Sequence, residues 1–320
     1  MISWPPVTGR PIALKALSQI GGKSPYRDHA HAGVYTGGAN AVYWFDILTD
    51  HGDGTVTARN ITEGAKRQIE SVQVRLEKEL LYPLLRGRDV HRWRANPSAF
   101  LLFVQDPKTR SGIDEETMAR DYPLALQWLE RNRRALESRS AYKRYFQRGK
   151  DSFFTMFDVG EYTLAKFRVS WRRVANELDV AVVNAASEPR VLSDSTLVEI
   201  TCESLNEGYF VAGVMNSTFY RLAVANYIVL HPDVHILGNL YVPKYDASCG
   251  LHREIKAEAE RLSSGADDVD APVHEALDQL CARIWKIGDP SAITAVQNAF
   301  LELYGSPASS PELEEATADE

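Results

Sequence analysis

The apolar residues of this chain come in many short runs of unequal length, and this pattern limits the folds that the chain can adopt. Residues 99–105 and 180–185 form runs of the length of a buried strand, whereas the run at 207–229 is long enough for a helix. Strands and helices that do not alternate regularly predict an α+β fold, with mixed sheets and packed helices. The same irregularity argues against a doubly wound dinucleotide-binding fold or a barrel.

Turn-forming and helix-starting residues divide the chain further. The turn His51–Gly54 predicts a hairpin, in which a Gly-rich loop and strand over 32–48 are followed by a second strand over 55–62. Asp121 before Pro123 predicts the start of a helix. Further strands are predicted at 166–174, 180–185, 190–201 and 239–245, and further helices at 207–229, 251–262 and 271–304.

Composition changes along the chain predict four regions. The acidic end, rich in proline and serine, is expected to be disordered. The regions are an irregular N-terminal segment (1–32), a main domain (33–250), a helical segment (251–304) and the disordered acidic tail (305–320).

Charges are distributed unevenly along a chain whose net charge is −7. Residues 59–173 hold 24 Lys and Arg against 15 Asp and Glu, whereas residues 251–320 hold 5 against 15. The region 59–173 is therefore the candidate surface for a polyanion such as DNA, and the acidic end is not.

The stretch LRGRDVHRWR at 85–94 concentrates positive charge around a glycine. If its second half is extended, the last three arginines share one face; if it is helical, two of them still do, four residues apart. The arginine fork donates two hydrogen bonds to O6 and N7 of guanine, and it also neutralises phosphates. The residues predicted to contact DNA here are Arg86, Arg88, Arg92 and Arg94.

The sequence leaves a second interpretation of this stretch open. Asp89 could pair with a neighbouring arginine in an ordinary turn, and Trp93 could belong to the core.

Two other basic clusters are predicted to contact DNA phosphates. Residues 140–154 interleave basic residues with Tyr142, Tyr145 and Phe146, which could instead pack inward under a solvated basic face. A third basic point follows Trp171. The basic residues concerned are Lys143, Arg144, Arg148, Lys150, Arg172 and Arg173.

The loop Gly37-Gly38-Ala39-Asn40 could enter a groove of DNA. The Asn40 amide can pair with adenine through two hydrogen bonds. The equally open alternative is a hairpin turn with Asn40 at positive φ.

Motifs of several common active sites are absent from the sequence. It holds no Walker phosphate loop, no G-x-G-x-x-G that opens a helix, and no G-x-S-x-G nucleophile elbow. His231 and His235 are separated by a proline, and Cys249 with His252 lacks a second ligand pair, so no metal site is predicted. The three cysteines lie far apart, which is typical of a reducing cytoplasm.

Six segments of the chain, in order, resemble one known family. They are GVYTGGANAVYW (33–44), LLYPLLRGRDVHRW (80–93), DYPLALQWLERNRRALESR (121–139), KFRVSWRRV (166–174), GYFVAGVMNSTFY (208–220) and LGNLYVPKYDASCGLHREIKAEAERLS (237–263). This order resembles the C-terminal target recognition, or specificity, domain of Type IIG (Eco57I- and TaqI-like) adenine-N6 DNA methyltransferases. The resemblance covers roughly residues 30–263. It implies a target-recognition-domain-like fold and binding to double-stranded DNA.

The chain departs from that family in its chemistry. It lacks the S-adenosylmethionine-binding glycine motif and the N-P-P-Y/F motif, and WPPV (4–7) has neither the Asn nor the aromatic residue. The resemblance therefore implies a non-enzymatic specificity subunit of a restriction-modification or phage-defence system, or a truncated relative. S-adenosylmethionine is then expected in a partner methyltransferase, and this chain is expected to hold no cofactor.

Two other classes of function remain open. The chain could be an assembly protein whose basic face docks an acidic partner of a defence complex. It could also be a nuclease with an unrecognised site, for which Glu161 and Lys166 are the candidates. No membrane span is predicted, because no run of about 18 uncharged apolar residues occurs, and no secretory signal opens the chain, so a cytoplasmic location is expected.

Overall fold

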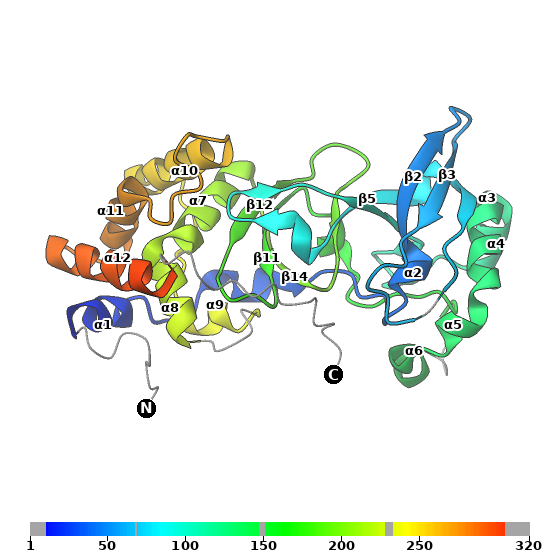
Figure 1. Ribbon diagram of the computed structural model, residues 1–320, viewed down its shortest axis with the longest axis horizontal. Helices are drawn as coiled ribbons and strands as arrows, with labels where there is room; N and C mark the ends of the chain where they lie inside the picture. The colour runs from blue at the N-terminus through cyan, green and yellow to red at the C-terminus, as the bar shows by residue number, and fades with distance from the viewer. Residues whose placement is uncertain (1–10, 68, 147–150, 228–232, 305–320) are drawn as a thin grey trace.

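The computed structural model describes residues 11–67, 69–146, 151–227 and 233–304. These residues form an elongated molecule in which two bodies lie side by side (Figure 1). The six-stranded body contains a six-stranded sheet with helices α2 to α6, and the helical body contains a four-stranded sheet with helices α1 and α7 to α12. Mixed sheets with packed helices confirm the predicted α+β fold.

The six-stranded sheet has the order β13-β5-β8-β2-β3-β4. Its strands are β2 (Trp44–Asp50), β3 (Thr55–Asn60), β4 (Gln73–Glu77), β5 (Leu81–Leu85), β8 (Ala99–Leu102) and β13 (Leu192–Ser193). Neighbours are antiparallel except β13, which runs parallel to β5. β2 and β3 form the predicted hairpin, whose turn uses Gly52 and Gly54 at positive φ (73° and 86°).

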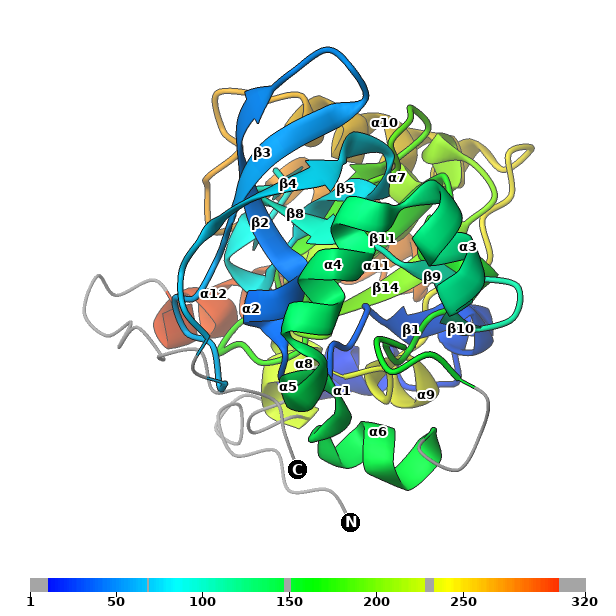
Figure 2. The same ribbon diagram turned by 90° about the vertical axis from the view of Figure 1, so that its right-hand side faces the viewer.

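Helices cover this sheet from the side that faces the viewer in Figure 2. They are α3 (Glu115–Asp121), α4 (Pro123–Arg131), α5 (Arg133–Glu137) and α6 (Ser140–Tyr145), and the short α2 (Asn40–Tyr43) precedes β2. Helix α4 begins at Pro123, as predicted. The Glu77 carboxylate accepts hydrogen bonds from the N–H groups of Leu124 (2.8 Å) and Ala125 (2.9 Å), so the end of β4 caps this helix.

The smaller sheet has the order β1-β14-β11-β12, and its neighbouring strands are antiparallel. The strands are β1 (Ala30–Ala32), β11 (Phe167–Arg172), β12 (Val180–Asn184) and β14 (Leu197–Cys202). Separate two-residue pairs are β6 (Val90–His91) with β7 (Arg94–Ala95), and β9 (Gln105–Asp106) with β10 (Ser111–Gly112).

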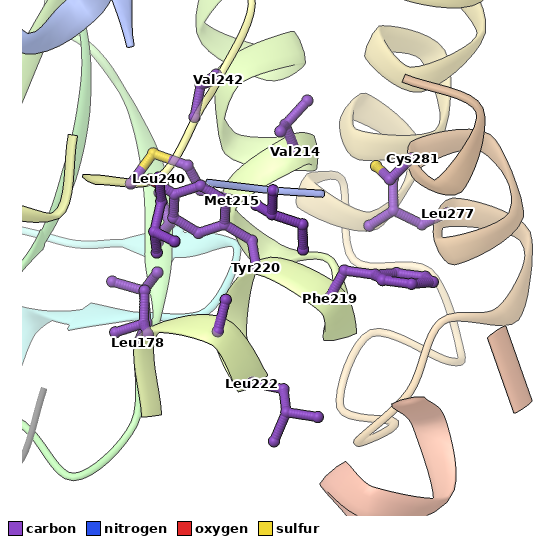
Figure 3. Close-up of a cluster of buried hydrophobic side chains, with 14 of the residues drawn as sticks. Leu178, Val214, Met215, Phe219, Tyr220, Leu222, Leu240, Val242, Leu277 and Cys281 are labelled. Atoms are coloured by element: carbon purple, nitrogen blue, oxygen red, sulfur yellow. The ribbon is translucent and has the colours of Figure 1, made fainter. Parts of the chain in front are cut away.

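The helices of the helical body share one core with this sheet. They are α1 (Pro11–Ser18), α7 (Leu205–Asn216), α8 (Thr218–Tyr227), α9 (Ile236–Asn239), α10 (Gly250–Ser263), α11 (Glu275–Ile284) and α12 (Pro290–Tyr304). Met215, Phe219 and Tyr220 lie in this core, where Phe219 extends toward Leu277 and Cys281 of α11 and Tyr220 toward Leu240 (Figure 3). Residues 251–304 therefore share a core with 205–242. Within the described ranges, no helix combines the length and apolarity needed to cross a membrane.

Glycine sets how closely the two longest neighbouring helices of this core approach. A Cβ at Gly213 of α7 would lie 3.0 Å from Ile255 Cγ2 and 3.1 Å from the Ala259 Cβ of α10. The absence of a side chain at Gly213 thus permits close packing of α7 against α10.

Several elements differ from the sequence-based predictions. The segment 1–32, predicted to be irregular, contains α1, which packs against α12. The predicted strand 239–245 is reduced to a bridge between Leu240 and Gly21. The predicted helix 271–304 is interrupted between α11 and α12, where Lys286 has a φ of 58°. The predicted tail 305–320 lies outside the described residues.

The predicted helix 207–229 is divided at Ser217. This residue has extended backbone angles (φ −60°, ψ 147°), which end α7. The Asp278 carboxylate then accepts the N–H of Thr218 at 2.8 Å, so a side chain from α11 caps the start of α8. The Ser217 hydroxyl also accepts the N–H of Tyr220 at 3.4 Å, so a local N-cap residue marks the break together with the distant Asp278.

Candidate nucleic-acid interface

The arginine-rich stretch 85–94 forms a short hairpin, and is neither the single strand nor the single helix that its spacing allows. A 3₁₀ turn (Gly87–Asp89) follows β5 and leads into β6 and β7. His91 pairs with Arg94, so Arg92 and Trp93 form a two-residue turn. The arginines consequently lie in different surroundings.

Arg86 is buried and holds the turn together. Its guanidinium donates to Ser98 Oγ at 2.6 Å, and its Nε lies 3.6 Å from Asp89 Oδ2. Asp89 also accepts the N–H of Arg86 at 2.8 Å and the Ser98 hydroxyl. Asp89 therefore pairs with a neighbouring arginine, as the second interpretation of this stretch proposed, and that arginine is Arg86. Because Arg86 is buried, little of its side chain is accessible to DNA.

Arg92 and Trp93 contact the helical body. Arg92 donates to the carbonyl oxygens of Ala271 (2.6 Å) and Pro272 (3.2 Å). Trp93 belongs to the core, with 3% of its surface exposed. These contacts correct the prediction that Arg92 shares one exposed face with Arg88 and Arg94.

Arg88 and Arg94 are the exposed arginines of the hairpin. The Arg88 side chain is 43% exposed and lies 4.0 Å from Glu63, which is 80% exposed. The Arg94 side chain is 46% exposed and lies 3.6 Å from Asp270, which is 84% exposed. Both ion pairs are long and open to solvent, so they cost little to exchange for other partners.

Arg172 and Arg173 lie at the end of β11 and are held by carboxylates. Arg172 is 3.1 Å from Asp179, and Arg173 is 3.1 Å from Asp233. These half-buried pairs belong to the helical body, so the two arginines do not join the cluster on α6.

Asn40 begins the four-residue helix α2 instead of forming a hairpin turn. The Thr36 hydroxyl donates to Asn40 Oδ1 at 2.5 Å and accepts the N–H of Ala39 at 3.2 Å. Gly37 and Gly38 have φ values of 69° and 74° and supply the reversal that the turn interpretation assigned to Asn40. A short helix thus intervenes where the sequence predicted a strand directly after the loop.

The basic cluster on α6 is partly exposed, as the sequence predicted. Lys143 and Arg144 are exposed, and Arg144 lies 5.2 Å from the ring centre of Tyr145, itself 63% exposed. Tyr142 is buried, in agreement with the inward-packing interpretation for that ring. Arg148 and Lys150 lie outside the described residues.

Arginines that sequence reasoning did not single out extend this basic surface. Arg67 donates to Oγ of Ser138, the residue directly after α5, at 2.7 Å, and Arg131 of α4 lies 3.3 Å from Glu70, so two points of the segment 61–72 contact these helices. A surface cavity of about 500 Å³ lies between them, lined by Trp128, Arg131 and Arg134 among others.

Contacts link part of this surface in space. Arg88 reaches Glu63 at the start of the segment 61–72, and α6 follows directly after α5. We call the following set the basic band: Lys66, Arg67, Arg88, Arg131, Arg134, Lys143 and Arg144. The excess of positive charge in residues 59–173 was the sequence signal for it, but that excess does not separate band residues from Arg133, which three glutamates surround.

The residues considered for nuclease chemistry lie apart from this band. Glu161 opens a 3₁₀ turn (Glu161–Leu164), and Lys166 precedes β11; both are exposed. Among the residues that the structure describes, no group of three or more His, Cys, Asp or Glu side chains could hold a metal ion.

Comparison with known proteins finds similarity at the level of structure. No protein-family model and no curated protein matches the sequence. One similar solved structure is the Type IIL restriction-modification enzyme MmeI in complex with DNA, with a TM-score of 0.49, 11% identity, and coverage of 88% of this chain and 35% of that one. Another is the type IIG restriction endonuclease BpuSI, with a TM-score of 0.43, 13% identity, and coverage of 93% and 33%.

The chain thus spans about a third of the length of these solved proteins. At these scores the likeness carries no argument about what this chain binds or does.

Proposed function

We propose that this chain is a DNA-recognition part of a restriction-modification system, and that it binds duplex DNA through the basic band and the hairpin 86–95. In this proposal, adenine methylation takes place in a separate methyltransferase that binds S-adenosylmethionine. The six segments that resemble the specificity domain of Type IIG enzymes support the class of system. The observation that carries DNA binding is the basic band, in which the segment 61–72 contacts Arg88, Arg131 and Ser138.

The electrostatics of the band support a polyanion as its ligand. The band combines seven basic side chains from three separate stretches, and two of them, Arg88 and Arg131, lie beside the exposed carboxylates of Glu63 and Glu70. Exposed ion pairs of this kind contribute about 0–1 kcal/mol each, so phosphates can displace the carboxylates at little cost. Release of counterions from DNA then favours binding.

In this proposal the basic residues have two roles. A two-stranded ribbon fits the major groove, and the exposed arginines of the hairpin, Arg88 and Arg94, are the candidates to read guanine. Band residues on helices and on the segment 61–72 would contact phosphates, which position the protein without reading sequence. Arg86, Arg172 and Arg173 support the fold.

Binding to mixed-sequence duplexes, measured by fluorescence anisotropy over a series of salt concentrations, tests this proposal. We expect log K to fall linearly with log salt, with a slope of about 0.9 per phosphate contacted. Arg67→Ala with Arg134→Ala should reduce the slope by nearly 2 if each contacts one phosphate. Lys23→Ala, at an exposed lysine of the helical body, is the matched control and should leave the slope unchanged.

Two results would count against DNA as the ligand. One is binding that does not depend on salt. The other is an equal loss of affinity in the band variant and the control. Band-dependent capture of an acidic protein, without affinity for DNA, would instead favour the assembly function.

A further inference from the structure

The turn of the arginine hairpin has an uncommon conformation that needs an explanation. Trp93 has a φ of 69°, in the left-handed region that a bulky residue rarely adopts. Such strain persists only where surrounding contacts hold the residue in place. The N–H of Trp93 donates to the Val180 carbonyl of β12 at 3.0 Å, which is the first of these contacts.

The indole of Trp93 is held by a histidine of the helical body. Its Nε1–H donates to His274 Nε2 at 3.3 Å, and the two rings meet edge to face with centres 5.8 Å apart. Burial, and then the nearby Arg92, lower the pKa of His274 to about 4. His274 is therefore neutral near pH 7, and its Nε2 is able to accept this hydrogen bond.

Arg92 adds a second attachment to the same loop. Its two terminal nitrogens donate to the carbonyl oxygens of Ala271 and Pro272, at 2.6 and 3.2 Å. Arg221 of α8 donates to the same Pro272 oxygen at 3.0 Å, which ties the loop to the core of the helical body. The loop 271–274 is therefore a rigid seat for the turn.

The other end of the hairpin is attached to the smaller sheet. Leu85 and Val90 pack against Ala181, Val183 and Leu197 of β12 and β14 in a small separate core. The hairpin is thus held both at its base and at its turn, while the side chains of Arg88 and Arg94 remain exposed.

The geometry points to Arg92 and Trp93 as positioning residues for DNA recognition: they seat the hairpin on the loop 271–274 so that Arg88 and Arg94 are presented at a fixed spacing. This inference rests on the proposed function, because it assumes that Arg88 and Arg94 contact DNA. In this inference the acidic helical body contributes to recognition by holding the hairpin, and does not itself contact DNA. The spacing of the two exposed arginines then depends on residues about 180 positions away in the sequence.

The first arm of the test measures the seat without DNA. Amide hydrogen exchange of residues 90–95 is compared in the full chain and in the variants Trp93→Phe and Arg92→Met. Trp93→Phe keeps a ring but removes the indole N–H, and Arg92→Met removes both bonds to the loop. We expect exchange in the hairpin to become roughly tenfold faster or more, while exchange in β2 and β3 stays the same.

His91→Ala is the matched control for this arm, because His91 is an exposed residue of the same hairpin and its backbone pairing with Arg94 survives the change. Its hairpin should exchange at the rate of the unaltered chain. Unchanged exchange in both seat variants would overturn the inference. If either variant unfolds, His274→Leu replaces it, because it removes the acceptor of the Trp93 indole N–H and should speed exchange in the hairpin in the same way.

The second arm measures affinity for a pool of mixed-sequence duplexes in a double-mutant cycle. Trp93→Phe should weaken binding roughly tenfold in the unaltered chain, and should have no effect once Arg88 and Arg94 are both alanine. A positioning role requires this non-additivity, whereas a general loss of stability would weaken both backgrounds equally. Equal effects in the two backgrounds would overturn the positioning role.

Failure of the proposed function gives a different result. If the unaltered chain binds no duplex, DNA recognition and the positioning role both fall. The exchange arm still decides in that case whether the loop holds the hairpin.

Discussion

Arg86 and Arg88 are separated by one glycine, yet their side chains lie in different surroundings. Arg86 is buried between Asp89 and Ser98, whereas Arg88 is 43% exposed beside an exposed glutamate. A buried arginine whose partner is removed leaves an uncompensated charge, and an exposed one does not. The two residues therefore respond to substitution in opposite ways.

We expect Arg86→Ala to lower the free energy of unfolding by about 3–5 kcal/mol, because it leaves the Asp89 carboxylate buried without its arginine. Arg88→Ala should change stability by less than about 0.5 kcal/mol but weaken DNA binding. Urea denaturation of both variants measures the first effect. A mild effect of Arg86→Ala, equal to that of Arg88→Ala, would contradict the structural role of Arg86.

A buried carboxyl in the helical body predicts a pH dependence of stability. Burial raises the pKa of Asp278 from 3.8 to about 6, although the N–H of Thr218, the Gln297 amide and the charge of Arg221 oppose the shift. Between these two pH values the folded chain keeps a proton that the unfolded chain releases. The free energy of unfolding should therefore fall as pH rises from about 4 to about 6, by about 3 kcal/mol at most, and this contribution is constant above that range.

Asp278→Asn removes this titration and should flatten the dependence. His274 has the opposite dependence, because its lowered pKa makes stability rise over nearly the same range. The difference between the unaltered chain and the variant, from urea denaturation between pH 4 and pH 8, cancels the contribution of His274. If that difference does not vary with pH, Asp278 titrates normally.

At the scale of elements, local sequence predicted whatever depends on neighbours along the chain. The β2–β3 hairpin, the start of α4 at Pro123 and the helix α10 followed from turn residues, a helix-starting proline and apolar spacing. The break between α7 and α8 was missed because the apolar run continues across it, although Ser217 is a local N-cap residue beside the distant cap Asp278. The hairpin in 85–94 was also not predicted. Its turn residue Arg92 is bonded to a loop about 180 residues away, which the local sequence does not reveal.

For the candidate site too, the sequence indicated the region but not the surroundings of each side chain. The charge excess of residues 59–173 indicated the region of the proposed surface, which includes Lys143 and Arg144. Separating Arg88 from Arg86, or Arg134 from Arg133, requires knowing which carboxylates are nearby, and Arg133 contacts Glu115, which is 18 positions away.

One glycine at the junction of the two bodies is expected to be essential for the fold. Gly33 directly follows β1, and a Cβ there would lie 2.5 Å from the carbonyl oxygen of Ser193 and closer still to that of Asp194. Because these neighbours are backbone atoms, Gly33→Ala should cost about 1–3 kcal/mol of stability, as overpacking does. Gly288→Ala is the control, since nothing lies within 4 Å of its Cβ. Equal urea midpoints for the two variants would refute this constraint.

At the scale of the whole molecule, the two bodies contribute unequally to the proposed interface. The six-stranded body and the hairpin carry the basic band, whereas the acidic helical body supplies the seat for the hairpin. Most of the basic region 59–173 lies in the six-stranded body and the hairpin, and the acidic region 251–304 lies in the helical body. DNA should approach the side formed by the segment 61–72, the hairpin and helices α4 to α6.

Lysine acetylation with and without duplex DNA, read by mass spectrometry, tests this central claim most directly. All lysines compared are exposed: Lys66 and Lys143 in the band, and Lys15 and Lys286 in the helical body. Bound DNA should slow acetylation of Lys66 and Lys143 together, and leave the rates at Lys15 and Lys286 unchanged. Protection of Lys15 and Lys286, with Lys66 and Lys143 modified as fast as in the free protein, would contradict the account.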